Sequence, residues 1–205
     1  MYRNYLKRLL DIICSLLGLI ILSPLLLVVI VVMLFANKGA GVFFSQARPG
    51  RGERLFNMYK FKSMTDERDA AGNLLPDAKR LTAMGRFIRK TSIDELPQLW
   101  NVLRGDMSLV GPRPFLATYR QIPTKRRKVE IISVSIEGDA IEITPAQRVR
   151  YEVRPGITGL AQINGRNKLS YQRRFEYDAW YVRHLSLALD LKICLLYTSP
   201  SPRDS

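Results

Sequence analysis

The chain contains very little cysteine and histidine. Its 205 residues include two cysteines, Cys14 and Cys194, and one histidine, His184. Two cysteines so far apart do not make a disulfide framework, and their scarcity is typical of a protein from a reducing compartment. The histidine follows Trp180 by one helical turn, and we expect it to be structural rather than catalytic.

Negative charge is also scarce. The chain has 32 lysines and arginines but 18 aspartates and glutamates, which gives a net charge of +14. This excess predicts an anionic partner, and nucleic acid, acidic lipid headgroups and phosphorylated substrates all qualify. No nucleic-acid-binding motif accompanies the charge, so we expect no nucleic acid among the partners.

Residues 12–36, IICSLLGLIILSPLLLVVIVVMLFA, contain no charged side chain. A helix rises 1.5 Å per residue, so one of this length could cross a hydrocarbon core of about 30 Å. The run is too long for a signal-peptide core, and no small-residue cleavage site follows it. We therefore expect a membrane-embedded helix over residues 1–37, followed by one cytoplasmic domain over residues 38–193.

Basic residues stand on both sides of the apolar run, and they are Arg3, Lys7, Arg8, Lys38, Arg48, Arg51 and Arg54. The positive-inside rule draws both ends to the cytoplasm. Ser23-Pro24 could allow this, because proline clashes with the carbonyl of Ile20 and the serine hydroxyl can bond a freed carbonyl. The prediction is a re-entrant helix broken at Ser23-Pro24, and the alternative is a kinked helix that spans the membrane.

An acidic pair, Asp94-Glu95, lies among the basic residues Arg89, Lys90, Arg104 and Arg113. One carboxylate could attack phosphorus or hold a metal while guanidinium groups hold phosphate oxygens. The structural alternative is a helix N-terminus, with Ser92 as the cap and Glu95 in a capping box. The pair alone does not decide between them.

The rest of the domain reads as short elements. Alternation predicts a strand within residues 55–64 and a β-hairpin, interpreted as an insertion, within residues 125–145. Helical spacing predicts helices at 83–90, 93–103 and 170–193, the second with an inward face of Leu96, Leu99, Trp100 and Leu103. The fold class is therefore α+β and mainly helical, a re-entrant membrane helix with a small cytoplasmic domain containing short strands.

Two further segments are rich in polar residues. KRRK at 125–128 could touch acidic lipid, although a solvated charge run is the commoner explanation. Residues 194–205 end in a Ser/Pro-rich stretch that cannot build a core, so we expect a non-native or disordered tail there.

Three segments follow the apolar run in order: FFSQARPGRGERLFNMYKFKSM (43–64), TSIDELPQLWNVLRGDMSLVGPRP (91–114) and VRPGITGLAQINGRN (153–167). Together they resemble the bacterial monotopic phosphoglycosyl transferases, or bacterial sugar transferases, which begin glycoconjugate assembly on a polyprenyl phosphate. The likeness covers roughly residues 1–118 and 150–193.

The resemblance implies an activity. Members of this family move a sugar 1-phosphate from a UDP-sugar to polyprenyl phosphate and release UMP, with magnesium and a covalent intermediate on an aspartate. By position, Asp94 is the nucleophile, Glu95 is the metal ligand or general base, and both carboxylates are candidates for holding Mg²⁺. The expected phosphate-binding residues are Arg89 and Arg113, with Lys60, Arg48 and Arg154 behind them.

The same resemblance implies a monotopic protein of the inner (cytoplasmic) membrane whose catalytic domain faces the cytoplasm. Its expected partners are a UDP-sugar, polyprenyl phosphate and the membrane with its anionic phospholipid. The competing hypothesis is a membrane-tethered basic module that binds nucleic acid or anionic lipid without catalysis. That hypothesis explains the charge and the anchor, but it does not explain the acidic pair.

Overall fold

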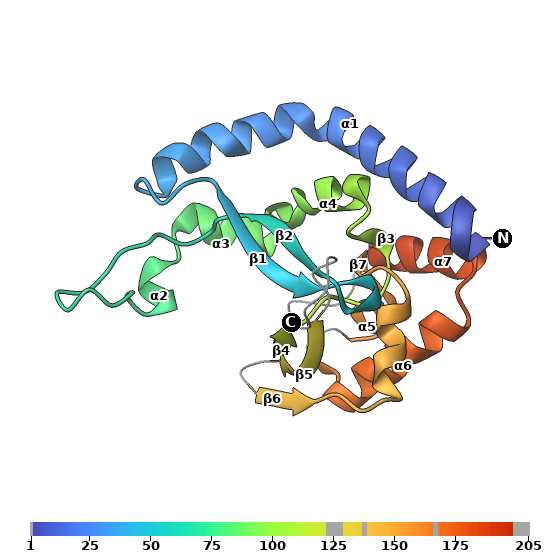
Figure 1. Cartoon of the computed structure of the whole chain (residues 1–205). Coiled ribbons are helices and arrows are strands. Elements are labelled where there is room, and N and C mark those ends of the chain that lie inside the picture. The colour runs from blue at the N-terminus through green and yellow to red at the C-terminus, as the bar shows by residue number, and fades with distance from the viewer. Residues whose placement is uncertain (1, 122–128, 137–138, 166–167, 199–205) are drawn as a thin grey trace.

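The computed structural model describes residues 2–121, 129–136, 139–165 and 168–198. The described chain is about half helical with short strands, as the sequence predicts (Figure 1). A π-helical turn at Tyr2–Leu6 precedes α1 (Lys7–Ala36), and the other α-helices are α2 (Asp77–Arg80), α3 (Ala83–Lys90), α4 (Gln98–Arg104), α5 (Leu160–Ile163), α6 (Tyr171–Arg183) and α7 (Leu187–Thr198). Short 3-10 helices occupy Arg51–Glu53, Ile93–Glu95 and Gln147–Glu152.

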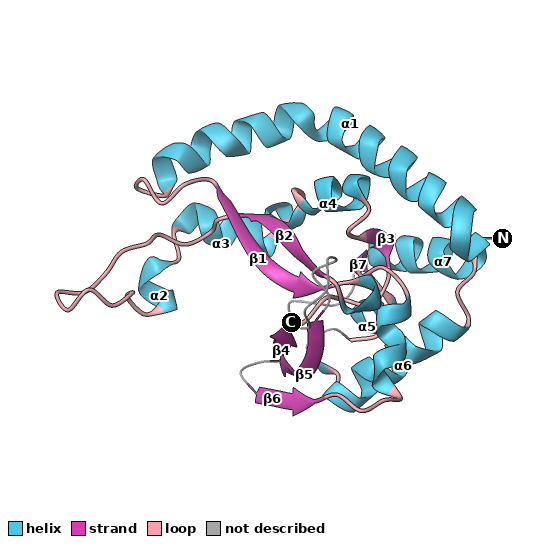
Figure 2. Cartoon of the chain, viewed as in Figure 1, coloured by secondary structure: helices cyan, strands magenta, loops and turns pink. Residues whose placement is uncertain are grey.

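The strands form small separate sheets among the helices (Figure 2). Antiparallel β1 (Phe43–Pro49) and β2 (Leu55–Phe61) make one, and parallel β3 (Ser108–Val110) and β7 (Gly156–Thr158) make another. The third contains β4 (Leu116–Gln121), β5 (Val129–Ile136) and β6 (Asp139–Glu142), all antiparallel. β2 and α3 fall where the sequence predicts a strand and a helix.

Helix α1 runs without interruption through Pro24 and arches over the domain (Figure 1). The Ser23 hydroxyl donates to the Ile20 carbonyl at 2.7 Å, the contact expected from the sequence. Since that carbonyl is satisfied although Pro24 has no N–H to give it, the helix can bend and continue. The predicted break at Ser23-Pro24 is therefore wrong, while re-entry stays a prediction.

The outer surface of α1 is apolar. Exposed side chains include Leu9, Ile13, Leu17, Ile21, Leu27, Val28, Leu34 and Phe35. By length and composition the helix could cross a membrane. A helix with so much exposed apolar surface indicates membrane association.

The inner surface of α1 packs on α4. A Cβ placed on Gly18 would lie 3.4 Å from Leu99 Cδ1, so the two helices approach closely there. The inward face predicted for α4 is only partly correct. Trp100, which was expected to face inward, is 50% exposed, whereas Asn101 is fully buried. Asn101 accepts from the Tyr59 amide at 3.0 Å and donates to the Asn57 carbonyl at 2.7 Å, which fastens α4 to β2.

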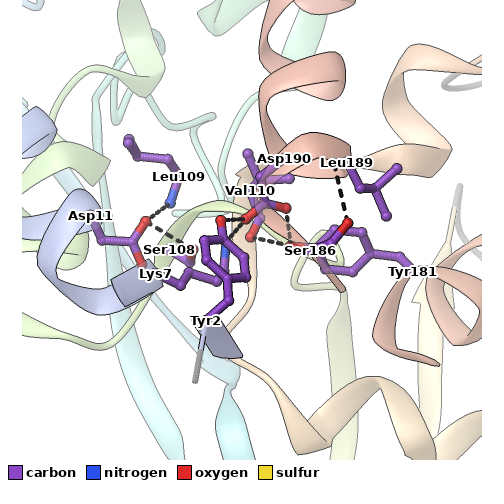
Figure 3. Close-up of polar contacts among 10 residues, drawn as sticks. All are labelled: Tyr2, Lys7, Asp11, Ser108, Leu109, Val110, Tyr181, Ser186, Leu189 and Asp190. Carbon is purple, nitrogen blue, oxygen red and sulfur yellow. Dashed lines mark hydrogen bonds and ion pairs between the residues drawn. The ribbon is translucent and has the colours of Figure 1, made fainter. Parts of the chain in front are cut away.

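A buried polar network holds the start of α1 to the domain (Figure 3). Lys7 Nζ lies 2.6 Å from Asp190 Oδ2 on α7, and Tyr181 donates to the other oxygen of Asp190 at 2.7 Å. Asp11 accepts from the Ser108 hydroxyl and the Leu109 amide of β3, each at 3.0 Å. We call these residues the N-terminal anchor, and it fixes α1 to both α7 and β3.

β5 and β6 pair where the sequence predicts a hairpin. β4 adds a third strand that the sequence reading missed, and the sheet is not merely a surface feature. Its side chains Val129, Ile131 and Val134 are buried against a cluster that includes Tyr151 and Phe175. KRRK at 125–128 and the turn residues 137–138 lie outside the described residues.

The predicted helix over 170–193 is two helices, because the chain turns between Arg183 and Leu187. The turn lets α7 fold back so that Ile193 and Cys194 pack beside Tyr181 and Asp190 reaches Lys7. α7 continues to Thr198, so residues 194–198 are helical and the expectation of disorder is wrong for them. Residues 199–205 lie outside the described residues.

Candidate active site

A cavity of about 880 Å³ opens between β1, β2, α3, α5 and α6. Its wall contains both carboxylates of the acidic pair and most of the predicted phosphate-binding residues. Those residues are Asp94, Glu95, Arg48, Lys60, Arg89 and Arg113. The structure therefore brings together, around one cavity, residues that lie up to 65 positions apart in the sequence.

The acidic pair stands in the short 3-10 helix ahead of α4, which begins at Gln98 after Pro97. Ser92 has a φ of 58°, in the left-handed region, and within the described chain its side chain makes no capping hydrogen bond. The structure therefore excludes the alternative of a capping box, and the predicted single helix over 93–103 is wrong. The left-handed residue turns the chain so that both carboxylates face the cavity rather than their own backbone.

Glu95 is clamped by two cations. Its Oε1 accepts from Lys60 Nζ at 2.8 Å and from Arg113 Nη2 at 2.7 Å. Burial alone would raise the pKa of this carboxyl, but the charges and hydrogen bonds of Arg113 and Lys60 lower its pKa to about 2. Glu95 is therefore ionised at neutral pH.

Asp94 is held less tightly than its neighbour. Lys60 Nζ is 3.9 Å from Asp94 Oδ2, against 2.8 Å from Glu95. Burial raises the pKa of Asp94, the charge of Lys60 opposes that rise, and the nearby charge of Glu95 adds to it. Because Glu95 takes the close cation contacts, the Asp94 oxygens keep lone pairs for another partner.

Arg48 and Arg89 line the same cavity from β1 and α3. Arg89 donates through Nε to the Ser63 hydroxyl at 2.7 Å. α3 can approach Ser63 because Gly85 has no side chain, since a Cβ there would lie 1.9 Å from the Ser63 carbonyl oxygen. Burial, with the charge of Arg113, lowers the pKa of Arg48 to about 10, which still leaves it cationic at neutral pH.

The turn that carries Arg113 is held from behind. The Gly111 amide donates to Thr158 at 2.9 Å, and the Gly156 amide donates to Pro112 at 3.0 Å. Arg150, ion-paired with Asp178 at 3.0 Å, donates to the Arg113 carbonyl at 2.5 Å. The backbone of Arg113 is thus fixed by β7 and by a buried guanidinium.

Arg154 does not line this cavity, so the prediction that it binds phosphate beside the acidic pair is wrong. Its Nε donates to the Gly105 carbonyl at 2.8 Å, just beyond the C-terminus of α4. It lines a separate small cavity with Lys7 and Asp11. The segment that follows Arg154 forms β7, which pairs in parallel with β3 and holds the turn that carries Arg113. Arg154 itself precedes this strand and lies outside the cavity.

Several cavity residues were missed by the sequence reading. They are Lys62, Arg80, Gln162, Arg174 and Asp178. Arg80 lies in α2, a helix that the sequence did not predict, and Gln162 lies in the segment 153–167, from which Arg154 was the expected phosphate-binding residue. No local spacing in the sequence connects these residues with Asp94, so only the fold could find them.

Within the described residues, no cluster of three or more Asp, Glu, His or Cys side chains could hold a metal. The acidic pair supplies neighbouring carboxylate oxygens, one of which is already shared by Lys60 and Arg113. Mg²⁺ commonly binds through one or two carboxylates together with waters and substrate phosphates. The residues present fit that mode of binding but not an all-protein metal cage.

Comparison with known proteins gives a consistent result. The family model for bacterial sugar transferases matches residues 2–200. The uncharacterized sugar transferase EpsL of Bacillus subtilis (strain 168) is 50% identical over 191 residues, which cover 93% of this chain and 84% of EpsL.

Two further relatives have names that state an activity. The UDP-glucose:undecaprenyl-phosphate glucose-1-phosphate transferase of Klebsiella pneumoniae is 41% identical over 197 residues, covering 93% of this chain and 38% of the relative. The undecaprenyl-phosphate galactose phosphotransferase of Salmonella typhimurium is 38% identical over 207 residues, which cover 93% of this chain and 39% of the relative. This chain therefore spans well under half of these two longer relatives. With a family match over nearly its whole length and 50% identity to EpsL over 93% of the chain, this protein belongs to the bacterial sugar transferase family.

Proposed function

We propose that the chain transfers a sugar 1-phosphate from a UDP-sugar to membrane polyprenyl phosphate. The products are polyprenyl-diphosphate-sugar and UMP, and the reaction is the first membrane step in the assembly of a glycoconjugate. The observation that carries the proposal is the pair Asp94-Glu95 in the wall of a cavity that Arg48, Lys60, Arg89 and Arg113 also line. Two relatives named as undecaprenyl-phosphate sugar phosphotransferases support it.

The first step forms a covalent intermediate. An oxygen of Asp94 bonds to the β-phosphorus of the donor while the bond from that phosphorus to the bridging oxygen breaks. The bridging oxygen leaves with the α-phosphate as UMP. Asp94 suits this role because its oxygens are less engaged by Lys60 than those of Glu95.

The second step releases the product. A phosphate oxygen of polyprenyl phosphate bonds to the same phosphorus while the bond to Asp94 breaks, and the carboxylate is restored. In both steps negative groups approach one another, so the cations around the cavity lower the repulsion and stabilise the charge that develops on the phosphoryl oxygens. Arg113 and Lys60 also keep Glu95 ionised beside Asp94.

Asp94 and Glu95 would hold Mg²⁺ together with donor phosphate oxygens, and the ion would neutralise charge on the diphosphate. The assay that tests the function measures UMP released from a UDP-sugar in the presence of polyprenyl phosphate. Chelation of divalent metal is expected to stop UMP release, and added magnesium is expected to restore it. Full turnover in excess chelator would contradict the metal requirement and leave the transfer reaction in place.

Arg113→Lys tests phosphate binding in the cavity. Lysine keeps the charge but loses the planar guanidinium, so we expect kcat/KM for the donor to fall roughly ten- to a hundredfold. Arg104→Lys is the matched control, since Arg104 is exposed and does not line the cavity. Equal activities for both variants and the parent, at equal melting temperature, would exclude Arg113 from phosphate recognition.

We also propose that the chain is monotopic in the inner (cytoplasmic) membrane, with both ends of α1 on the cytoplasmic side. The basic residues that flank α1 support this orientation. The polyprenyl tail would then stay in the bilayer while its phosphate reaches the cavity. Anionic phospholipid would interact with the same basic flanks.

A cysteine-labelling experiment tests the topology. Asn4→Cys and Ala40→Cys, each in a background lacking Cys14 and Cys194, are expected to resist a membrane-impermeant thiol reagent in intact cells. Both should react after permeabilisation, because each site is at least partly exposed on the protein. Labelling of the Asn4→Cys protein alone in intact cells would mean that α1 spans the membrane.

A further inference from the structure

The segment that carries Arg113 is also held by one buried arginine. Arg150, in the 3-10 helix Gln147–Glu152, is 3% exposed and donates from Nη2 to the Arg113 carbonyl at 2.5 Å. Its guanidinium also lies over the ring of Phe115, 4.3 Å from the ring centroid. Arg150 therefore contacts the chain at residues 113 and 115, and both of these residues line the cavity.

Arg150 directs its aligned hydrogen bond at a backbone carbonyl rather than at its carboxylate partner. Nη2 lies 3.0 Å from Asp178 Oδ2, but that oxygen has no aligned hydrogen bond among the described residues. Hydrogen bonds between guanidinium and carboxylate groups are the stronger ones, so the ion pair alone would favour another rotation of the guanidinium. The rings of Phe115, Tyr151 and Phe175 lie 4.3, 5.5 and 5.1 Å from it and hold the observed rotation.

Stability alone does not account for this arrangement. Within the described residues, Arg150 Nη1 and the Tyr151 hydroxyl are also buried without a hydrogen-bond partner. Burial raises the pKa of Asp178 to about 6 although the charge of Arg150 opposes the rise. Replacing a buried ion pair by well-packed apolar groups is often neutral or stabilising, so a pair with unpaired polar atoms needs another explanation. Control of the turn that carries Arg113 is the explanation that fits these contacts.

The position of this turn matters because Arg113 contacts the acidic pair. Its Nη2 donates to Glu95 Oε1 at 2.7 Å, on the wall of the cavity. A displacement of about 1 Å at a reacting site can cost on the order of a hundredfold in rate, even when the altered residue lies elsewhere. A residue that fixes the Arg113 backbone can therefore affect the reaction without touching a substrate.

We propose that Arg150 is a positioning residue for the transfer reaction, which acts through Arg113 by holding its carbonyl, and that Asp178 balances the buried charge of Arg150. The inference rests on the proposed function. Arg150 does not line the cavity, whereas Asp178 does, so the test is built on Arg150. The alternative is that the ion pair only joins the 3-10 helix to α6.

Arg150→Met removes the hydrogen-bond donor and the charge and keeps an unbranched side chain. We expect kcat/KM for the UDP-sugar to fall about tenfold, because the Arg113 backbone loses a charge-assisted hydrogen bond. The loss should be divided between kcat and KM as it is in Arg113→Lys. Arg148→Met is the matched control and should leave kcat/KM close to that of the parent. Arg148 lies in the same 3-10 helix but pairs with Glu53 at 2.6 Å and donates to the Ile131 carbonyl at 2.8 Å.

The double variant Arg150→Met/Arg113→Lys distinguishes positioning from general support of the fold. If Arg150 acts through Arg113, its removal should change kcat/KM much less once Arg113 is already altered, because residues in contact with one shared role are not additive. The same fold-loss in both backgrounds would overturn the proposal. Normal activity of the folded Arg150→Met protein would overturn it as well.

The melting temperature of each variant shows whether it folds. If Arg150→Met does not fold, Arg150→Met/Asp178→Leu takes its place, because an apolar pair leaves no buried charge and should be about as stable as the parent. Its loss of activity should likewise shrink in the Arg113→Lys background, and a loss of unchanged size there would overturn the proposal. Failure of the parent to release UMP from any UDP-sugar would contradict the proposed function itself. Normal UMP release by the parent, with either overturning result, would contradict only the role of Arg150.

Discussion

Asp94→Asn is expected to remove both turnover and the covalent intermediate. Asparagine has nearly the same shape but cannot attack phosphorus, so kcat should fall on the order of 10⁴-fold or more. The fold should be preserved, because the nearest cation, Lys60, is 3.9 Å away and has Glu95 as its main partner. An unchanged melting temperature would confirm that the loss is chemical.

Mass spectrometry gives the direct measurement. The parent enzyme, mixed with UDP-sugar and magnesium but no acceptor, should gain the mass of one sugar phosphate and release one equivalent of UMP. Asp94→Asn should do neither, while Glu95→Gln should be slow but keep a small residual adduct, because its nucleophile is present. Asp66→Asn is the matched control, since Asp66 lines the same cavity but pairs with Lys62.

Steady-state kinetics provide an independent check on this intermediate. A covalent enzyme form predicts parallel reciprocal plots when donor and acceptor are varied. Intersecting lines together with no adduct would point to direct transfer through a ternary complex. That result would leave the family assignment intact and overturn the role of Asp94.

Asp190→Ala is expected to cost about 3–5 kcal/mol of the free energy of unfolding, the usual effect of removing one partner of a buried ion pair. Lys7 is 9% exposed in the N-terminal anchor, so its charge would be left buried without a partner. The Tyr2 hydroxyl would lose its acceptor as well, and the Tyr181 hydroxyl would keep only the Val110 carbonyl at 3.1 Å. Denaturation in detergent solution would measure the loss.

The control is a second ion pair between the N-terminal turn and the domain. Arg3 and Glu152 lie 3.0 Å apart, but their side chains are 43% and 55% exposed. Glu152→Ala should therefore cost no more than about 1 kcal/mol. Equal losses for Asp190→Ala and Glu152→Ala would show that burial does not determine the strength of the anchor.

The anchor also bears on the active site. Asp11 bonds β3 at Ser108 and Leu109, and the next residues of the chain carry Arg113. The start of the apolar helix and the cation that clamps Glu95 are therefore connected through one short strand. Asp190→Ala is expected to lower activity as well as stability for this reason.

The sequence by itself determined what depends on neighbours along the chain. An uncharged run predicts an apolar helix, alternation predicts β2 and the β5–β6 hairpin, and helical spacing predicts α3. The acidic pair and four of the five predicted cations also reached one cavity. All of these residues except Arg89 lie in the segments that carry the resemblance to the family.

Only the tertiary structure decided which side of each element faces the cavity. Arg154 points away because β7 pairs with β3, and the helix predicted over 170–193 divides so that Asp190 can meet Lys7. Gln162 enters the site because glycines at 111, 156 and 159 let separate segments touch. These outcomes depend on contacts between residues far apart in sequence, and local propensity carries no information about such contacts.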